Sequence, residues 1–314
     1  MSNKLTIGID HGYSMMKTPN FAFPAGVEAY DYKPYTDKNT LEYGGMFYVV
    51  GSGRQPLQKD KTATEDYYLM TLAAVAKEIE CRNAERMAEV RVAAGLPLTG
   101  FGREMEKFRK YLLRDGRPVS FHYEGRDYNI VITDVSMFPQ GYAAILTQGE
   151  LLKEPSVVVG DLGGWTFDLG WTFDLMRLDR RLPDASTCRS LELGVIRCLD
   201  EIEEQVRRKT GLSVTTAQIE SVLRGEPCGI RNAVREVIDR QAEKYVRRIV
   251  SSMMQSGLDV RTIPTIFLGG GAGLVKRYAQ AVEDIRNPVI LDDISLNAKA
   301  YERLAERLPQ NGNA

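Results

Sequence analysis

Apolar positions in the first half of the chain alternate between strand-like runs and helical spacing. Two short strands joined by an acidic, glycine-containing turn are predicted in "KLTIGIDHGYSMMKTPNFAFPAG", and a third apolar run is "GGMFYVVG". A helix is predicted over about 64–83, because Tyr68, Leu72, Val75 and Ile79 recur at a spacing of three to four residues. A buried strand in "EVRVAAGLPL", an amphipathic helix in "GREMEKFRKYLL" and a strand leading into a helix in "YNIVITDVSMFPQGYAAIL" complete this half.

The second half repeats the order of the first. It begins with a strand, an acidic glycine turn and a strand in "PSVVVGDLGGWTFDL", and helices follow at about 194–209, 216–224 and 230–255. A strand, a glycine turn and a helix are then expected in "TIPTIFLGGGAGLVKRYAQAV". Because both halves open on an Asp-x-Gly hairpin, at Asp10 and Asp161, the pattern predicts two related α/β domains with a cleft between them.

Length and composition agree with a globular protein of about two domains, since the chain has 314 residues and is 43% hydrophobic. Lys and Arg number 41 and Asp and Glu number 42, a formal net charge of -1 that gives no global attraction to nucleic acid or anionic lipid. We therefore expect no direct contact with nucleic acid or membrane, and any link to DNA would run through a partner.

The cysteines and histidines do not predict a structural zinc site. The four cysteines form no CxxC pair, and His11 and His122 lie far apart in the sequence. Reduced thiols are the simplest interpretation, and no run approaches the roughly 18 apolar residues that a membrane span needs. These features together favour a cytoplasmic protein.

Three glycine-containing turns carry the candidate chemistry. In the first, Gly12 allows backbone N–H groups to face an anion, Ser14 adds a hydroxyl, and Lys17 can neutralise a phosphate oxygen. Asp10 is of the type that binds hydrated Mg²⁺ through one carboxylate. Most Asp-x-Gly turns between strands are only turns, so this motif alone leaves a plain turn open.

The second and third turns are richer in glycine. Asp161 is followed by Gly163, Gly164 and Thr166, which permit close backbone approach to a ligand and offer a hydroxyl, although a two-glycine hairpin alone would look the same. The third turn, "FLGGGAGL" at 267–274, follows an apolar strand and opens a helix, where glycines let a flat base and ribose lie against the backbone. Neither a G-x-G-x-x-G motif nor a Walker lysine is present.

The order and spacing of the three turns resemble the actin, sugar-kinase and heat-shock-chaperone ATPase superfamily over nearly the full chain. Within it, the sequence is most similar to plasmid-segregation actin-like ATPases of the ParM/StbA type. The segments that carry this likeness are "AAGLPLTGFGREMEKFRKYL", "TCRSLELGVIRCLDEI" and "LNAKAYERL". The resemblance implies a duplicated actin-like (ribonuclease H-like) α/β fold, with domain I at 1–150, domain II at 151–290 and a C-terminal helix at about 295–310 packing back on domain I.

The resemblance also implies ATP, with GTP as an alternative, and Mg²⁺ in the cleft. Asp10 and Asp161 would hold the metal, mainly through water. The residues that would bind the nucleotide are Asp10, Gly12, Tyr13, Ser14, Lys17, Gly163, Gly164, Trp165, Thr166, Gly194, Gly269, Gly270, Gly271 and Ala272. His11 is an unusual residue to find beside the aspartate of this turn. One interpretation is that His11 is only a surface residue of the turn.

Two residues are candidates for catalysis. Gln140 lies where the superfamily places a glutamine or glutamate that aligns the attacking water, and the alternative is a helix-capping or solvent-facing amide. A glutamine cannot act as a general base, so Asp161 is the better candidate to polarise that water. Asn297 lies at the small-residue start of the last predicted helix, which we expect to serve a hinge between the domains.

The resemblance favours a filament-forming ATPase that segregates plasmid DNA. Such a protein would associate with itself and with a DNA-binding adaptor of the ParR type. We expect no added peptide-binding domain of the chaperone kind, and we identify no aspartate placed as a sugar-activating base. A non-polymerising phosphotransferase and a cytoskeletal scaffold of the same superfamily remain the alternatives.

The six residues "GWTFDL" occur twice in tandem, at 164–169 and 170–175. The first copy completes Asp-x-Gly-Gly-x-Thr, whereas the second has one glycine fewer, so the first is expected to hold phosphate. The second copy would then lengthen the outgoing strand by about 20 Å, with side-chain alternation preserved. The extra residues either run past the partner strand or form a loop; a loop at the turn would put Trp171 and Thr172 in the places of Trp165 and Thr166.

Overall fold

The computed structural model divides the chain into two compact units, which are described separately. Unit 1 is Met1–Thr147 with Ile294–Ala314, and unit 2 is Gln148–Asp293. The structure describes residues 4–52, 60–163, 173–191, 193, 195–278, 285–286 and 288–308. None of the helices within these ranges is both long and apolar enough to span a membrane.

Unit 1 is built on one mixed sheet, whose strand order in the described residues is β3-β2-β1-β7-β9-β8-β5-β6-β4. Strands β1, β7 and β9 run parallel, and the other neighbours are antiparallel. The strands are β1 (Lys4–His11), β2 (Met15–Lys17), β3 (Ala22–Pro24), β4 (Val27–Tyr30), β5 (Thr40–Tyr43), β6 (Met46–Val50), β7 (Met87–Leu96), β8 (Pro118–Tyr123) and β9 (Arg126–Pro139). The helices are α1 (Asp66–Cys81), α2 (Phe101–Leu113), the 3₁₀ turn η1 (Arg114–Gly116), α3 (Tyr142–Leu146) and α8 (Leu296–Arg307).

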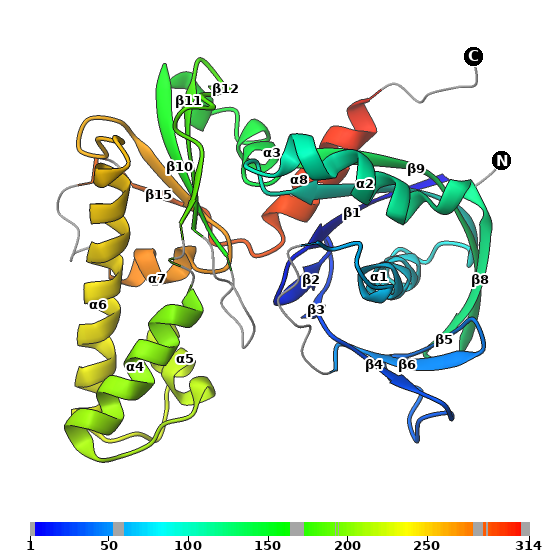
Figure 1. Cartoon of the computed structure of the whole chain (residues 1–314), viewed down its shortest axis with the longest axis horizontal. Coiled ribbons are helices and arrows are strands. Elements are labelled where there is room, and N and C mark those ends of the chain that lie inside the picture. Colours follow the sequence, from blue (N-terminus) through cyan, green and yellow to red (C-terminus); the bar gives the residue numbers. More distant parts are fainter. Residues whose placement is uncertain are drawn as a thin grey trace. The chain divides into compact units, whose positions relative to one another are not determined.

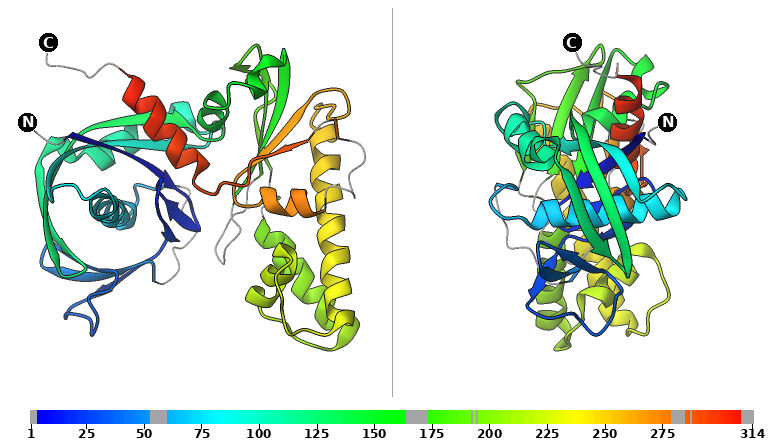
Figure 2. Two further views of the ribbon diagram at one scale, coloured as in Figure 1. Left: turned by 180° about the vertical axis from the view of Figure 1, so that it is seen from behind. Right: turned by 90° about the vertical axis from the view of Figure 1, so that its right-hand side faces the viewer.

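The sheet of unit 1 curls around α1, which both Figure 1 and Figure 2 show enclosed by strands. Successive residues of β1 point to opposite faces of the sheet. Ile7 and Ile9 therefore join the core around α1, while Gly8 between them faces α8. A side chain at Gly8 would place its Cβ 1.9 Å from the Ala298 carbonyl oxygen, so the glycine lets helix α8 approach the strand. The C-terminal helix is therefore an integral layer of unit 1.

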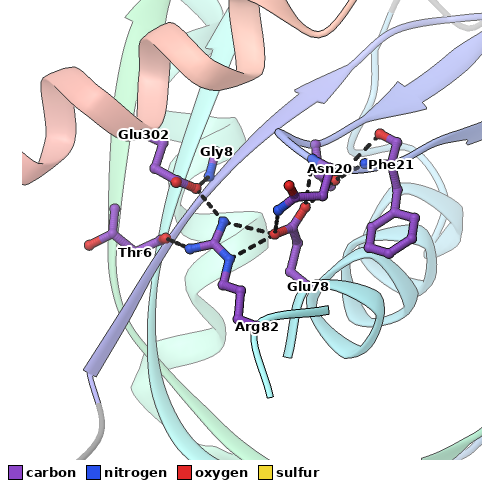
Figure 3. A network of polar contacts seen from close by, with 8 residues as sticks. Thr6, Gly8, Asn20, Phe21, Glu78, Arg82 and Glu302 are labelled. Carbon is purple, nitrogen blue, oxygen red and sulfur yellow. Dashed lines mark hydrogen bonds and ion pairs between the residues drawn. The ribbon is translucent and has the colours of Figure 1, made fainter. Parts of the chain in front are cut away.

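Polar contacts join α8 to the first half of the chain (Figure 3). The Glu302 carboxylate accepts hydrogen bonds from the Gly8 backbone N–H at 3.0 Å and from Arg82 at 2.7 Å. Arg82 also pairs with the buried Glu78 of α1, whose carboxylate accepts a hydrogen bond from the side chain of Asn20 just after β2. The network thus ties α8, α1 and the β2–β3 turn to the strand that carries the first candidate turn.

Unit 2 contains a smaller sheet, of order β12-β11-β10-β14-β15 with β13 beside β11 in the described residues. Strands β10, β14 and β15 run parallel, and β11 is antiparallel to β10. Its elements are η2 (Leu151–Lys153), β10 (Ser156–Leu162), β11 (Phe173–Asp179), β12 (Leu182–Pro183), β13 (Arg189–Leu191), α4 (Val195–Thr210), α5 (Thr216–Arg224), α6 (Asn232–Gln255), β14 (Thr265–Leu268), α7 (Ala272–Arg277) and β15 (Val289–Ile290).

Local sequence signals explain the helical layer of unit 2. Helix α6 buries one face, including Val234, Ile238 and Ile249, against a core shared with α4 and α5. Helix α5 begins with a capping box between Thr215 and Gln218 and ends at Gly225 in the left-handed region. The predicted helices at about 64–83, 194–209, 216–224 and 230–255 are confirmed by α1, α4, α5 and α6.

Candidate functional site

The first candidate turn connects β1 to β2 in unit 1. The antiparallel register places Asp10 opposite Lys17 and His11 opposite Met16, so the connection is Gly12–Ser14. A Cβ on Gly12 would lie 2.6 Å from the Met15 carbonyl oxygen, a distance that real Cβ atoms do not reach. The turn therefore needs glycine at position 12 for reasons of space.

Asp10 is the centre of a polar cluster at the end of β1. Its side chain is 1% exposed, and its two carboxylate oxygens accept hydrogen bonds from Lys17 Nζ at 3.3 Å and from Gln140 Nε2 at 3.1 Å. Gln140 follows β9 directly, and its backbone N–H donates to the Leu96 carbonyl at 2.8 Å. The structure thus brings together three predicted site residues that lie up to 130 positions apart.

A second backbone contact fixes the position of Gln140. The next residue, Gly141, has a φ of 72°, a conformation that favours glycine. Its N–H donates to Oδ1 of Asn297 on α8 at 3.0 Å in a buried contact. Gln140 lies in the turn just before α3, which begins at Tyr142, and its amide donates to a carboxylate rather than only facing solvent.

His11 is buried, so its interpretation as a surface turn residue is wrong. The Thr71 hydroxyl donates its one proton to the Tyr67 carbonyl at 2.7 Å, so His11 Nε2, 2.9 Å from the same hydroxyl, must be the donor in that contact. Burial, and after it the positive charge of Lys61, lowers the pKa of His11 from 6.5 to about 3. The imidazole is accordingly neutral near pH 7 and adds no charge to the turn.

In unit 2 the second and third candidate turns lie side by side. Strands β10 and β14 are parallel neighbours that pair Asp161 with Leu268, so both turns leave the same edge of the sheet. Gly269 has a φ of 87°, and a Cβ there would lie 2.3 Å from Asp161 Oδ1. The Gly271 N–H donates to the Leu162 carbonyl at 3.0 Å. The glycine turn therefore packs directly on the Asp161 carboxylate and on the chain that leads to Gly163.

A pocket of about 470 Å³ opens beside the glycine turn within unit 2. Its walls come from the turn and α7, from the end of α5, and from the chain after β15. They are Leu223, Arg224, Gly270, Gly273, Lys276, Arg277 and Asp292. The pocket has the size of a small-molecule site, and its cationic side chains suit an anionic or polar ligand. Ala272 is fully buried in the core at the start of α7.

Residues 164–172, most of the doubled "GWTFDL", lie outside the described residues, and with them the predicted lengthening of the outgoing strand. Strands β10 and β11 are seven residues each and pair from Ser156 with Asp179 to Leu162 with Phe173. Strand β11 is described from Phe173, so Phe173, Asp174 and Leu175 are the residues of the second copy that the structure describes. Asp174 of that copy, a residue that sequence reasoning missed, lies opposite Asp161.

Some predicted ligands lie outside the described residues: Gly164, Trp165, Thr166, Trp171, Thr172 and Gly194. Another missed residue, Lys61, is buried beside the first turn, and its Nζ donates to the His11 carbonyl. No motif points to Lys61, because it belongs to the chain before α1 and reaches the turn only through the tertiary fold.

The donors in both units fit the expected ligands. Asp10 and Asp161 are carboxylates at strand ends, and hard oxygen donors of this kind suit Mg²⁺ that keeps most of its water. Lys17 lies beside Asp10, where an ammonium group can neutralise a phosphate oxygen. A Cβ at Gly269 would collide with Asp161 and the Leu162 carbonyl, so glycine there lets the turn pack against them, and the adjoining pocket of about 470 Å³, lined by Gly270 and Gly273, has the size for a small ligand such as a nucleoside.

Comparisons with known proteins identify the fold. Residues 8–142 match the family model of actin like proteins, N-terminal domain, and residues 159–280 match that of the archaeal actin homologue MreB-like, C-terminal. The chain has the actin-like fold. The predicted α/β actin-like architecture is thereby confirmed, whereas a search of curated proteins by sequence found no significant match.

Solved structures with the actin-like fold superpose over almost the whole chain. An archaeal actin homolog, Ta0583, in complex with ADP has a TM-score of 0.73 at 21% identity, covering 98% of this chain and 100% of that one. ParM of Bacillus thuringiensis with ATP has a TM-score of 0.68 at 14% identity, covering 97% and 99%. An Alp12 filament structure has a TM-score of 0.69 at 16% identity, covering 97% and 99%. At these identities the likeness shows the fold.

Proposed function

We propose that the chain is an ATPase that assembles into nucleotide-dependent filaments and segregates plasmid DNA through a DNA-bound adaptor. The observation that carries the proposal is the convergence of Asp10, Lys17 and Gln140 at the end of β1. It joins a metal-binding carboxylate, a phosphate-neutralising ammonium group and a water-orienting amide, the groups that phosphoryl transfer to water requires. The similar structures that hold ADP or ATP, and the one that is a filament, support this proposal.

The residues of the two units take complementary roles in the proposal. The first turn, with Tyr13, Ser14 and Lys17, and the second turn, beginning at Asp161, bind the phosphates. Mg²⁺, when bound, neutralises charge that develops on the phosphates. Gln140 orients the attacking water and Asp161 polarises it, while the glycine turn and its pocket bind adenosine or, as the alternative, guanosine.

Self-association and an adaptor complete the proposed function. Head-to-tail contacts that do not close on themselves produce an open helical polymer. A formal net charge of -1 favours DNA contact through an adaptor of the ParR type rather than directly. ATP-bound subunits would polymerise, and hydrolysis would make the filament unstable.

The proposal is tested by pelleting the purified chain with Mg²⁺ and ATP, ADP or no nucleotide, while phosphate release is measured in parallel. We expect a pellet that depends on ATP and disappears as phosphate is released. The absence of nucleotide-dependent polymer over a range of salt and crowding conditions would refute the filament proposal. Phosphate transfer to a metabolite instead of water would favour a phosphotransferase.

The variant Asp161→Ala adds a test of the catalytic assignment. It is expected to slow phosphate release by about a hundredfold, because an oriented water loses its polarising group, and to leave filaments long-lived. Asp259→Ala is the matched control, since Asp259 is a half-exposed aspartate of the same unit that pairs with Arg261. Equal phosphate release by Asp161→Ala and the control would remove Asp161 from its role.

A further inference from the structure

Lys61 is a buried lysine that contacts the first candidate turn at two points. The residue is 6% exposed, and its Nζ donates a hydrogen bond to the carbonyl of His11, the last residue of β1 before the turn. The same ammonium group lies 4.8 Å from the ring centroid of Tyr13, in the middle of the turn, and 5.4 Å from that of Tyr67. Lys61 therefore contacts residues on both sides of Gly12.

These contacts are of a kind that restrains conformation. A charged donor on a backbone carbonyl makes a stronger hydrogen bond than a neutral donor does, and it restricts rotation of the peptide group that enters the turn. A cation over an aromatic face is attracted by the ring quadrupole, most strongly where water is excluded, as it is for Lys61. The ammonium group therefore holds both the entry of the turn and the Tyr13 ring.

The chain around Lys61 is itself anchored to helix α2. Asp60 forms an ion pair with Lys107 of α2, on the solvent side of the segment. The Tyr111 hydroxyl donates to the Thr64 carbonyl at 2.8 Å, and Arg114 pairs with Glu65. Because three contacts to α2 and its end fix the segment from outside, the inward direction of Lys61 is determined by the fold of unit 1.

The charge of Lys61 also matters for an anionic ligand. Burying an ammonium group has a desolvation cost, which a nearby anion reduces. His11 is neutral, so the positive charges that the residues named above place beside the turn are those of Lys17 and Lys61. A phosphate group on the turn would be attracted by both, one at the surface of the site and one behind it.

We propose that Lys61 is a positioning residue for phosphate binding: it holds the turn Gly12–Ser14 in its binding conformation and adds a buried positive charge behind it. The inference rests on the proposed nucleotide-binding function and deepens it. It assigns Lys61 to the recognition of the phosphate chain, and not to that of the nucleoside.

Isothermal titration of the full chain with ATP, ADP and adenosine, at low and high salt, tests this inference. Lys61→Met keeps a side chain of similar length without the charge and is expected to weaken ATP binding about tenfold, ADP binding less, and adenosine binding not at all. Lys61→Arg keeps the charge and is expected to retain most of the affinity for ATP. The salt dependence of ATP binding should fall in Lys61→Met and not in Lys61→Arg.

The matched control is Lys107→Met, which removes a lysine that contacts the same segment at an exposed ion pair and leaves the turn untouched. It is expected to bind all three ligands as the wild type does. Wild-type affinity of Lys61→Met for ATP, or an equal loss for ATP and adenosine, would overturn the positioning role. If Lys61→Met does not fold, Lys61→Gln is titrated against the same expectations. A wild-type chain that binds none of the ligands would instead refute the proposed function.

Discussion

His11 illustrates how one buried residue makes stability depend on pH. Its pKa in the folded chain is about 3, compared with 6.5 in an exposed histidine. Between these values the unfolded chain binds a proton on His11 and the folded chain does not, so stability is lost as pH falls below about 6.5. We expect the wild type to lose about 2 kcal/mol through this residue between about pH 7 and pH 5.

Urea unfolding at the two pH values measures this effect, with His11→Gln as the comparison. The glutamine amide can still donate to Thr71 but does not titrate, so the free energy of unfolding of the variant should change less with pH than that of the wild type. Parallel pH dependences of the two chains would contradict the assignment. The two chains are compared by how steeply the free energy of unfolding changes with pH, and not by its absolute value, because the substitution also changes packing.

For single residues, the sequence predicts a place in the site only where the residue belongs to a local motif. Asp10 and Lys17 are seven positions apart in one hairpin, and the register places them opposite each other. The contact of Gln140 with Asp10 follows from the resemblance and from no local pattern. Lys61 could not be predicted, because its contact with His11 depends on how the chain before α1 is anchored to α2.

Among the elements, helix α8 depends on two glycines in the strands beneath it. A Cβ at Gly8 would lie 1.9 Å from the Ala298 carbonyl oxygen, and one at Gly95 would lie 2.1 Å from the Tyr301 hydroxyl oxygen. We expect Gly8→Ala to destabilise the protein by about 1–3 kcal/mol, because the backbone of α8 must move and its contacts with β1 are lost. Urea unfolding of the full chain, with helix content followed by circular dichroism, measures this change.

Gly102→Ala is the matched control for Gly8→Ala. Gly102 lies in the first turn of α2, where an added Cβ would meet no neighbouring side chain or element within 4 Å, so alanine there is expected to stabilise by about 0.5–1 kcal/mol. If Gly8→Ala lowers the free energy of unfolding and Gly102→Ala raises it, the destabilisation by Gly8→Ala is due to lack of space for a Cβ and not to loss of glycine as such. A Gly8→Ala chain as stable as the wild type would contradict close packing of α8 on β1.

Element type follows from sequence where one periodicity dominates. Helix α6 was predictable because Val234, Ile238 and Ile249 recur on one buried face. Strand β8 was missed, although Glu124 and Gly125 both have positive φ and form the tight turn that joins it to β9. Sheet order, including the return of α8 to β1, depends on contacts between distant residues that no local pattern encodes.

At the scale of the whole molecule, the tandem "GWTFDL" lies in the sequence between the described end of β10 and the first residues of β11. Among the described residues, pairing from Val157 with Leu178 to Leu162 with Phe173 determines the register, and it includes the last three residues of the second copy. The paired ends are separated by residues 163–172, ten residues by subtraction. Because the copies are identical, deleting either one yields the same chain, six residues shorter, in which four residues separate the same paired ends.

We expect this six-residue deletion to preserve the fold and to stabilise it by about 1 kcal/mol, because closing the shorter connection costs less entropy. A five-residue deletion, 164–168, distinguishes a connection from a strand. Loss of an odd number of residues from a strand would turn every following side chain to the other face, whereas a connection tolerates it. Urea unfolding of both shortened chains tests this. If the six-residue deletion is tolerated and the five-residue deletion is not, the extra residues belong to the strand, and the register that places Asp174 opposite Asp161 must be abandoned.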